Sequence, residues 1–163
     1  MAIDYGTDKE DENVWTAASD GDLDAVRRYI ETLGVDPNIK DDYGYTPLAA
    51  AVSYNHTPLI QYLLDKGADV NVVDGDGETP LFYCESKEIA ELLVSQGANI
   101  HVLNHENMSI LDRAEEEAGS QPTDLTEYYL SLGIERRCSF DGEEEEEDDD
   151  DAGGSEDDDD DEQ

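Results

Sequence analysis

Basic residues are scarce in this sequence, which has nine Lys and Arg side chains against 45 Asp and Glu in 163 residues. The formal net charge is −36 at pH 7, and residues 1–140 alone hold 28 acidic and nine basic side chains, a net charge of −19. Because phosphate groups are bound mainly by Lys and Arg, this charge disfavours direct binding to DNA, RNA or an anionic membrane. It favours a cationic partner.

Cysteines and long apolar runs are also few. The two cysteines, Cys84 and Cys138, lack a metal-type spacing and are too few for a disulfide scaffold, so we expect reduced thiols in an intracellular protein. No apolar run is long enough to span a bilayer, and the start MAIDYGTDKEDE lacks the basic and apolar regions of a signal peptide. A basic nuclear-import cluster is missing as well, so we expect a cytoplasmic or nuclear protein and leave both compartments open.

Residues suited to catalysis or metal binding are not grouped in the sequence. His101 and His105 have the spacing that places two ligands on one helix face, but they fall in a predicted loop, where that geometry is lacking. Cys84 falls among the small core residues of a predicted helix, where a buried, unreactive thiol is expected. We therefore predict no enzyme activity, no metal site and no cofactor.

A period of about 33 residues organises the remaining sequence. The phrase Thr-Pro-Leu at residues 46–48 recurs at 79–81, and in the weaker form Ser-Ile-Leu at 109–111. The phrase GADVN, which starts at Gly67, recurs as GANIH from Gly97. Two separate signals that keep the same phase indicate an internal repeat.

Each unit has the pattern of two short antiparallel helices. Thr46 suits an N-cap and Pro47 suits the first helical position, where its missing N–H has no consequence. The slim residues 48–52 make a first helix that can pack closely. Thr57-Pro58 repeats the cap and proline before a second helix, which we expect Gly67 to end in a left-handed conformation.

Three irregularities interrupt the period. Leu33 is a one-residue insertion before Gly34. The third unit is three residues shorter between Leu81 and Gly97, and we expect the turn between its two helices to be trimmed. In the fourth unit Asn107 stands at the position of the loop glycine. Asparagine is compatible with this position because it tolerates positive φ better than most residues.

This pattern resembles the ankyrin repeat. The resemblance implies an all-α solenoid of about four helix–turn–helix units joined by hairpin-like loops, with the loops and first helices on the concave side. We place a repeat domain at residues 11–138, with units near 11–40, 41–73, 74–103 and 104–135, a flexible segment at 1–10 and a disordered acidic tail at 139–163. We expect the chain to be a monomer.

The resemblance also implies where a partner would bind, at the exposed loop positions around the glycine and at the exposed end of each first helix. In this sequence these positions are Asp42, Tyr43, Tyr45, Ser53, Tyr54, Asp76, Glu78, His105, Glu106 and Met108. The first unit would add Ser19 and Asp20, although its loop departs from the pattern. Tyrosines and carboxylates without Lys or Arg suit an Arg- or Lys-rich segment, through cation–π contacts and forked hydrogen bonds. The alternative is that these are solvated loop residues with no binding role.

The end of the chain is almost purely acidic. Residues 141–163 contain 17 Asp and Glu and no Lys or Arg, so the segment cannot bury enough apolar surface to fold. It acts as an electrostatic sleeve for a basic protein, as a weak sponge for divalent cations, or only as a solubilising tail.

Together these features predict a protein–protein interaction module that binds or escorts a basic client, such as a ribosomal protein, a histone or a basic targeting segment. Some small ankyrin proteins with acidic tails resemble dedicated ribosomal-protein chaperones, which supports this hypothesis by analogy. The alternative is a general adaptor or assembly factor in a larger complex, with the tail only as a solubiliser.

Overall fold

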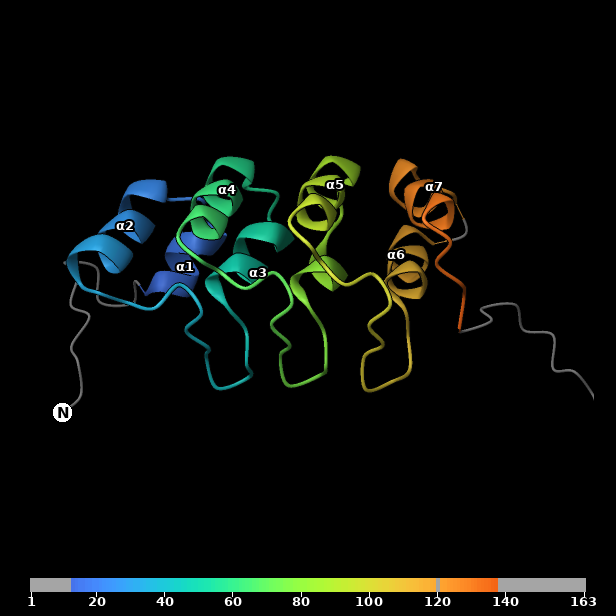
Figure 1. Ribbon diagram of the computed structural model, residues 1–163, viewed down its shortest axis with the longest axis horizontal. Helices are drawn as coiled ribbons and strands as arrows, with labels where there is room; N and C mark the ends of the chain where they lie inside the picture. Colours follow the sequence, from blue (N-terminus) through green and yellow to red (C-terminus); the bar gives the residue numbers. More distant parts are fainter. Residues whose placement is uncertain (1–12, 120, 138–163) are drawn as a thin grey trace, which may run out of the picture.

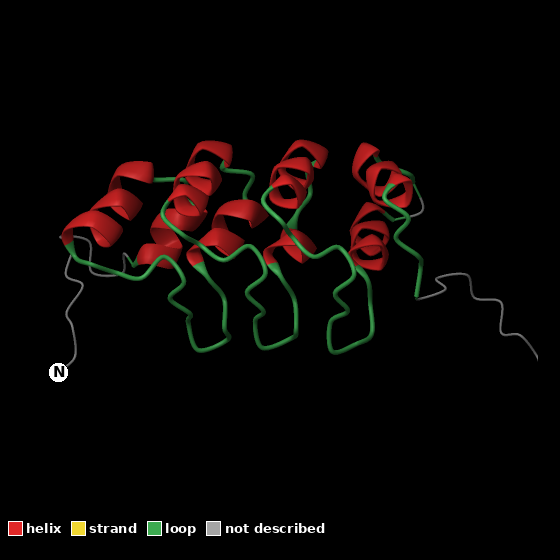
Figure 2. Ribbon diagram, in the orientation of Figure 1, coloured by secondary structure: helices red, strands yellow, loops and turns green. Residues whose placement is uncertain are grey.

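The computed structural model of the chain describes residues 13–119 and 121–137. The segment 1–10 that we predict to be flexible and the acidic tail at 139–163 lie outside this part. The described residues form pairs of helices that stand side by side along one direction (Figure 1). They contain no strand (Figure 2), so the predicted all-α repeat architecture is confirmed.

The four units share one order, in which a first helix near the hairpin loops is followed by a second helix on the far side (Figure 1). The first helices are α1 (Val14–Ser19), α3 (Pro47–Ser53), η2 (Pro80–Tyr83) and α6 (Ile110–Ala118). The second helices are α2 (Leu23–Arg27) with its continuation η1 (Arg28–Thr32), α4 (Thr57–Asp65), α5 (Lys87–Ser95) and α7 (Asp124–Ser131). Three hairpin loops project from the same side of the stack, which places their tips in a row.

The helices of the second unit start and stop close to the predicted residues. The Thr46 hydroxyl accepts the backbone N–H of Ala49 at 3.3 Å, as an N-cap should. Helix α4 starts one residue earlier than predicted, because His56 is its N-cap and Thr57 is already helical. Gly67 ends this helix with φ of +92°.

The inserted residue in the first unit is absorbed within its second helix. The Leu33 N–H donates to the carbonyl of Arg28, five residues earlier, at 3.1 Å, and residues 28–32 form a π-helical turn. A π-turn accommodates one extra residue without breaking the helix. The glycine that follows, Gly34, therefore keeps the phase of the repeat, with φ of +70°.

The three missing residues of the third unit are lost from its first helix, so the prediction of a trimmed turn is wrong. Element η2 is a single 3-10 turn that ends at Cys84, whose backbone is extended at φ −85° and ψ 121°. In this tight turn the Phe82 N–H bonds to the backbone carbonyl of Thr79 at 2.9 Å. The buried Thr79 hydroxyl consequently has no hydrogen-bond partner in the described structure.

Small residues in the first helices let neighbouring units approach closely. Ala17, Ala50 and Ala51 are fully buried, and the second helices pack against them with the stripe that includes Leu59 and Leu93. Since no single unit could bury these side chains alone, the core is continuous along the stack.

Asparagine side chains tie successive units together on the side of the second helices. The Asn38 amide donates to the carbonyl of Gly67 at 3.0 Å and accepts the N–H of Asp69 at 2.6 Å. Asn71 makes the same pair of bonds to the third unit, at 3.0 and 2.7 Å. His101 occupies the equivalent position in the third unit, where the sequence supplies no side-chain amide.

Candidate protein-binding surface

The three hairpins are built alike over six positions. They comprise residues 41–46, 74–79 and 104–109. At position 1 the side chain of Asp41, Asp74 or Asn104 accepts the backbone N–H groups of positions 3 and 5 at 2.8–3.1 Å. Position 4 takes a positive φ in every hairpin, which includes the predicted Asn107 at +64°. The side chain at position 1 therefore holds the backbone of the hairpin.

Positions 2 and 3 of each hairpin face solvent, and we call them the hairpin tips. They are Asp42 and Tyr43, Gly75 and Asp76, and His105 and Glu106. The Tyr43 side chain is 81% exposed. The Gly75 N–H donates to the carbonyl of Tyr43 at 2.7 Å, and the His105 N–H donates to that of Asp76 at 2.9 Å. These bonds fix the tips as one continuous row, so the predicted residues at these positions do lie together.

Position 5 points into the stack, which corrects two of the predicted binding residues. Glu78 is 6% exposed and Met108 is 7% exposed, so neither has the exposure that we expected for a partner contact. The Glu78 carboxylate accepts a hydrogen bond from Asn104 Nδ2 at 2.8 Å and pairs with the guanidinium of Arg113. A buried carboxylate requires such partners, so Glu78 joins the third unit to the fourth.

Tyr45, also at position 5, is half-buried. With Ser53 and Tyr83 it forms a layer of side chains between the tips and the first helices, which we call the wall. Its hydroxyl lies 2.8 Å from Ser53 Oγ, and because the Ser53 hydroxyl donates to the Ala49 carbonyl at 3.0 Å, Tyr45 is the donor to Ser53. Burial raises the pKa of Tyr45. The predicted residues Tyr45 and Ser53 are thus brought together, but as a fixed support.

Tyr83 belongs to the same wall and was missed by sequence reasoning. Its ring meets that of Tyr45 edge-on, with centroids 5.3 Å apart, and its hydroxyl donates to the Asp74 carboxylate. Burial, and then this hydrogen bond, raise the pKa of Tyr83. When the units are aligned on their helix caps, Tyr83 and Arg113 occupy equivalent positions, and this is the signal that could have found it.

Tyr54 is the second large exposed tyrosine on this side, with 61% of its surface accessible. It follows α3 and stacks on the His56 ring at a centroid distance of 6.4 Å and an angle of 18°. His56 Nε2 lies 2.7 Å from the carbonyl of Ser19, so this nitrogen carries a proton and donates it. The first unit thereby supports Tyr54, whereas the predicted contact residue Ser19 is half-buried and Asp20 is exposed.

The hairpins and first helices carry a strong excess of negative charge. Their only Lys or Arg in the described residues is Arg113, which pairs with Glu78 and, at 3.1 Å, with Glu116. Partial desolvation, followed by the negative charge of Glu85, raises the pKa of Glu117 at the end of α6. The hairpins and first helices themselves therefore carry too few cations to neutralise their negative charge.

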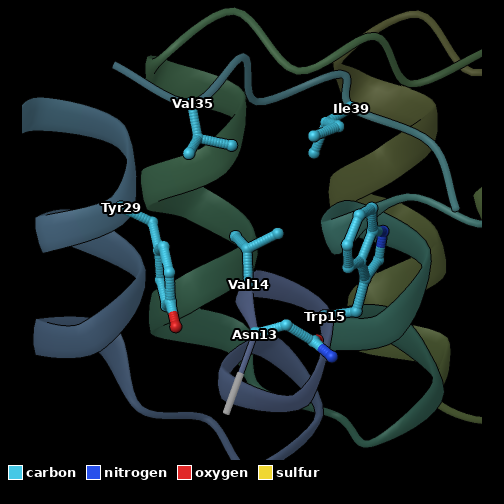
Figure 3. Close-up of a pocket in the computed structure, with 6 residues that line it drawn as sticks. All are labelled: Asn13, Val14, Trp15, Tyr29, Val35 and Ile39. Carbon is cyan, nitrogen blue, oxygen red and sulfur yellow. The ribbon is translucent and has the colours of Figure 1, made fainter. Parts of the chain in front are cut away.

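A small apolar pocket lies at the N-terminal end of the stack, between α1, η1 and the loop that leads to the first hairpin (Figure 3). Its lining residues are Asn13, Val14, Trp15, Tyr29, Val35 and Ile39. Trp15 and Ile39 face Tyr29 across it, and the lining contains no carboxylate, imidazole or thiol that could act as a catalytic base or nucleophile (Figure 3).

Other residues with possible chemistry do not assemble into a site in the part of the chain that is described. Within residues 13–119 and 121–137, no three His, Cys, Asp or Glu side chains are grouped so that they could hold a metal ion. Cys84 is 3% exposed, and burial raises the pKa of its thiol to about 11. None of the helices in these residues has the length and apolar character needed to cross a bilayer.

Comparison with known proteins supports the repeat assignment. A family model for ankyrin repeats, in three copies, matches residues 14–104. An ankyrin repeat-containing protein of Schizosaccharomyces pombe is 44% identical over 121 residues, which cover 74% of this chain and 57% of that protein. The E3 ubiquitin-protein ligase Ufd4 of Drosophila melanogaster is 36% identical over 98 residues, 58% of this chain and 4% of the ligase. The palmitoyltransferase akr1 of S. pombe is 39% identical over 64 residues, 39% of this chain and 10% of the transferase.

The matched region therefore spans little more than half of the first of these relatives and a small part of the other two. The family model covers the elements from α1 to α5. Ankyrin repeats are protein–protein interaction modules. The chain belongs to the ankyrin-repeat family.

Proposed function

We propose that this chain is a non-enzymatic module that binds a basic segment of another protein along its hairpin tips. The observation that carries the proposal is the combination of exposed tyrosines and carboxylates on the hairpins and first helices, whose one described Lys or Arg, Arg113, is already paired with Glu78 and Glu116. The clients that fit are those with Arg- or Lys-rich segments, such as ribosomal proteins, histones or basic targeting segments in the cytoplasm or nucleus.

The tips offer two kinds of contact to such a segment. The Tyr43 ring, 81% exposed, presents a face on which a guanidinium can lie, a contact that contributes about 0.5–2 kcal/mol. The exposed carboxylates of Asp42, Asp76 and Glu106 can accept forked hydrogen bonds from arginine. Because the hairpins are tied to each other, little conformational entropy is lost when a partner binds.

The same charge argues against a nucleic acid partner. Phosphate groups would meet Asp42, Asp76 and Glu106 at the tips, and no Lys or Arg of the described hairpins could bind them. Binding by a monomer is sufficient for this proposal, since one row of tips forms the whole surface.

The proposal is tested by titrating the chain with a basic peptide at increasing salt. A synthetic Arg-Ser repeat peptide about 20 residues long would reach about 65 Å when extended and could span the row of tips. Replacing Tyr43 by alanine removes one contact of about 1 kcal/mol, so we expect about a fivefold loss of affinity. Affinity for the unmodified chain should also fall steeply with salt, because the interacting charges are exposed.

The matched control is Leu130→Ala, which removes a large side chain, 43% exposed, from the second helix α7 on the opposite side. It should leave the affinity unchanged. Equal losses in the control and in the tyrosine variant, or equal binding of a Glu-Ser repeat peptide, would contradict the proposal.

A second candidate function is a general adaptor or assembly factor with no preference for basic partners. Its support is that ankyrin segments similar to this chain occur within proteins as different as a ubiquitin ligase and a palmitoyltransferase. Affinity purification followed by ranking of the captured proteins by isoelectric point separates the two, since an adaptor would enrich neutral and acidic partners equally.

A further inference from the structure

We propose that the junction between the first two hairpin tips binds one arginine side chain of the partner and selects arginine over lysine. The inference rests on the proposed function and deepens it, because it names the residue type that the partner must supply and the place where that residue binds. It is carried by a difference between the two junctions in the row of tips. A side chain fills one junction and is missing from the other.

The two junctions share the same backbone contact. In each of them, the residue at position 2 of one hairpin donates its N–H to the carbonyl at position 3 of the preceding hairpin. Gly75 donates to Tyr43 at 2.7 Å, and His105 donates to Asp76 at 2.9 Å. Residues 75 and 105 are therefore equivalent, and a side chain at either one would start from the same place relative to the preceding hairpin.

An imidazole ring fills the junction between the second and third hairpins. A Cβ at Gly77, which is position 4 of the second hairpin, would lie 2.8 Å from His105 Cδ2, so the His105 ring lies against the backbone of Gly77. Gly77 is buried in this arrangement. The junction thus accommodates one flat, polar ring beside the glycine at position 4.

The junction between the first and second hairpins lacks this ring, because residue 75 is glycine. Among the described residues, a Cβ at Gly75 would approach only the backbone of Tyr43, at 3.0 Å from its carbonyl oxygen. The atoms nearest to a Cβ at Gly44, the counterpart of Gly77, would be backbone atoms of the next hairpin. Gly44 is only half-buried, whereas Gly77 is buried. We call the space beside Tyr43 and Gly44 that residue 75 leaves without a side chain the open junction.

The open junction suits a guanidinium group. This group is flat, as the imidazole of the other junction is, and presents its N–H donors in a fixed fork. Tyr43, whose side chain is 81% exposed, borders the space from the first hairpin, and the exposed Asp76 borders it from the second. A tyrosine ring can stack on a guanidinium, and a carboxylate can accept its forked hydrogen bonds. A lysine ammonium is compact and strongly hydrated and cannot form the forked pair.

Selectivity is measured on the full chain with two peptides of equal charge, the Arg-Ser repeat and a Lys-Ser repeat of the same length. Attraction to the tip carboxylates as a whole is the same for both peptides, so a difference in affinity reports the contacts that only a guanidinium makes. We expect the unmodified chain to bind the Arg-Ser peptide at least about fivefold more tightly than the Lys-Ser peptide.

The location is tested by Gly75→His at pH 8, which gives the open junction the ring that the other junction already has. A histidine is mostly neutral at this pH, so the net charge hardly changes. The variant should bind the Arg-Ser peptide about fivefold more weakly and lose its preference over Lys-Ser. Because Tyr43→Ala removes the same contact, the two substitutions together should cost little more than either alone. Circular dichroism checks that the variants remain folded.

A second pair of variants tests the carboxylate without changing Gly75. Asp76→Asn should weaken binding of the Arg-Ser peptide more than that of the Lys-Ser peptide, because it removes the acceptor of the forked hydrogen bonds. Glu106→Gln is the matched control, since it removes the same charge from position 3 of the third hairpin. It should weaken binding of both peptides equally.

The outcomes separate this inference from the proposed function. If the unmodified chain binds neither peptide, both are wrong. If it binds the two peptides equally, or if Asp76→Asn and Glu106→Gln affect them alike, the tips attract positive charge without an arginine site and only the further inference is wrong. Retention of the full arginine preference by folded Gly75→His would likewise overturn the inference alone.

Discussion

Substitution by valine should change stability in different ways at the two threonines that precede Pro47 and Pro80. Thr46 and Thr79 are both 1% exposed, but the Thr46 hydroxyl accepts the Ala49 N–H whereas the Thr79 hydroxyl has no partner in the described structure. Replacing Thr46 by the near-isosteric valine removes a helix cap and leaves a buried N–H unpaired, which should lower the free energy of unfolding by about 1–2 kcal/mol. Replacing Thr79 by valine removes a buried hydroxyl that pairs with nothing, so stability should stay constant or rise by up to about 1 kcal/mol.

Urea unfolding measures the difference between the two variants. The single tryptophan, Trp15, donates its indole N–H to the Tyr45 carbonyl at 3.0 Å and so reports on the first two units, while far-UV circular dichroism reports on all the helices. We expect the urea midpoint to fall for Thr46→Val only, with the slope of the transition unchanged. Equal destabilisation by both substitutions would refute the reasoning, because it would mean that Thr79 caps a full helix in solution.

Three further predictions follow from individual contacts. His101→Asn supplies the amide that Asn71 supplies one unit earlier, so it should raise the free energy of unfolding by about 1 kcal/mol in urea titrations. Gly44→Ala places a Cβ 2.9 Å from the backbone of the next hairpin at φ +81° and should destabilise by about 2–3 kcal/mol, whereas Gly97→Ala, with open space around it at φ +91°, should cost only about 1 kcal/mol. Because burial raises the Cys84 pKa to about 11, iodoacetamide at pH 8 should modify this thiol at least about 100-fold more slowly in the folded chain than in urea, as followed by mass spectrometry.

The repeat and its phase could be predicted because they depend on local chemistry. The threonine cap, the proline at the first helical position and the glycine at the helix end each act on neighbouring residues, and Thr46, Pro47 and Gly67 behave as expected. The inserted Leu33 was visible for the same reason, although the π-turn that absorbs it was not. The position of the three-residue deletion could not be predicted, because the start signal Thr79-Pro80 is intact and the sequence does not show where the helix after it stops.

The binding residues were predicted less well because exposure depends on partners far along the chain. The side chains of Asp42, Tyr43 and Asp76 are exposed because positions 2 and 3 lie at the projecting ends of the hairpins. The burial of Glu78 depends on Arg113, 35 residues away, and no local pattern reveals that pair. Aligning the shortened third unit on its cap shows only that Tyr83 is equivalent to Arg113, and its contact with the Tyr45 ring depends on the fold.

The acidic residues of the hairpins fall into separate structural and exposed groups, and this division limits what the net charge can do. Asp41 and Asp74 hold the turns through backbone N–H groups, and Glu78 holds Arg113, so these carboxylates already serve the fold. The carboxylates left for binding are those at the tips, where solvent screens them and each contributes little alone. Affinity for a cationic chain must therefore come from several such groups in a line, which is the arrangement of the hairpin tips.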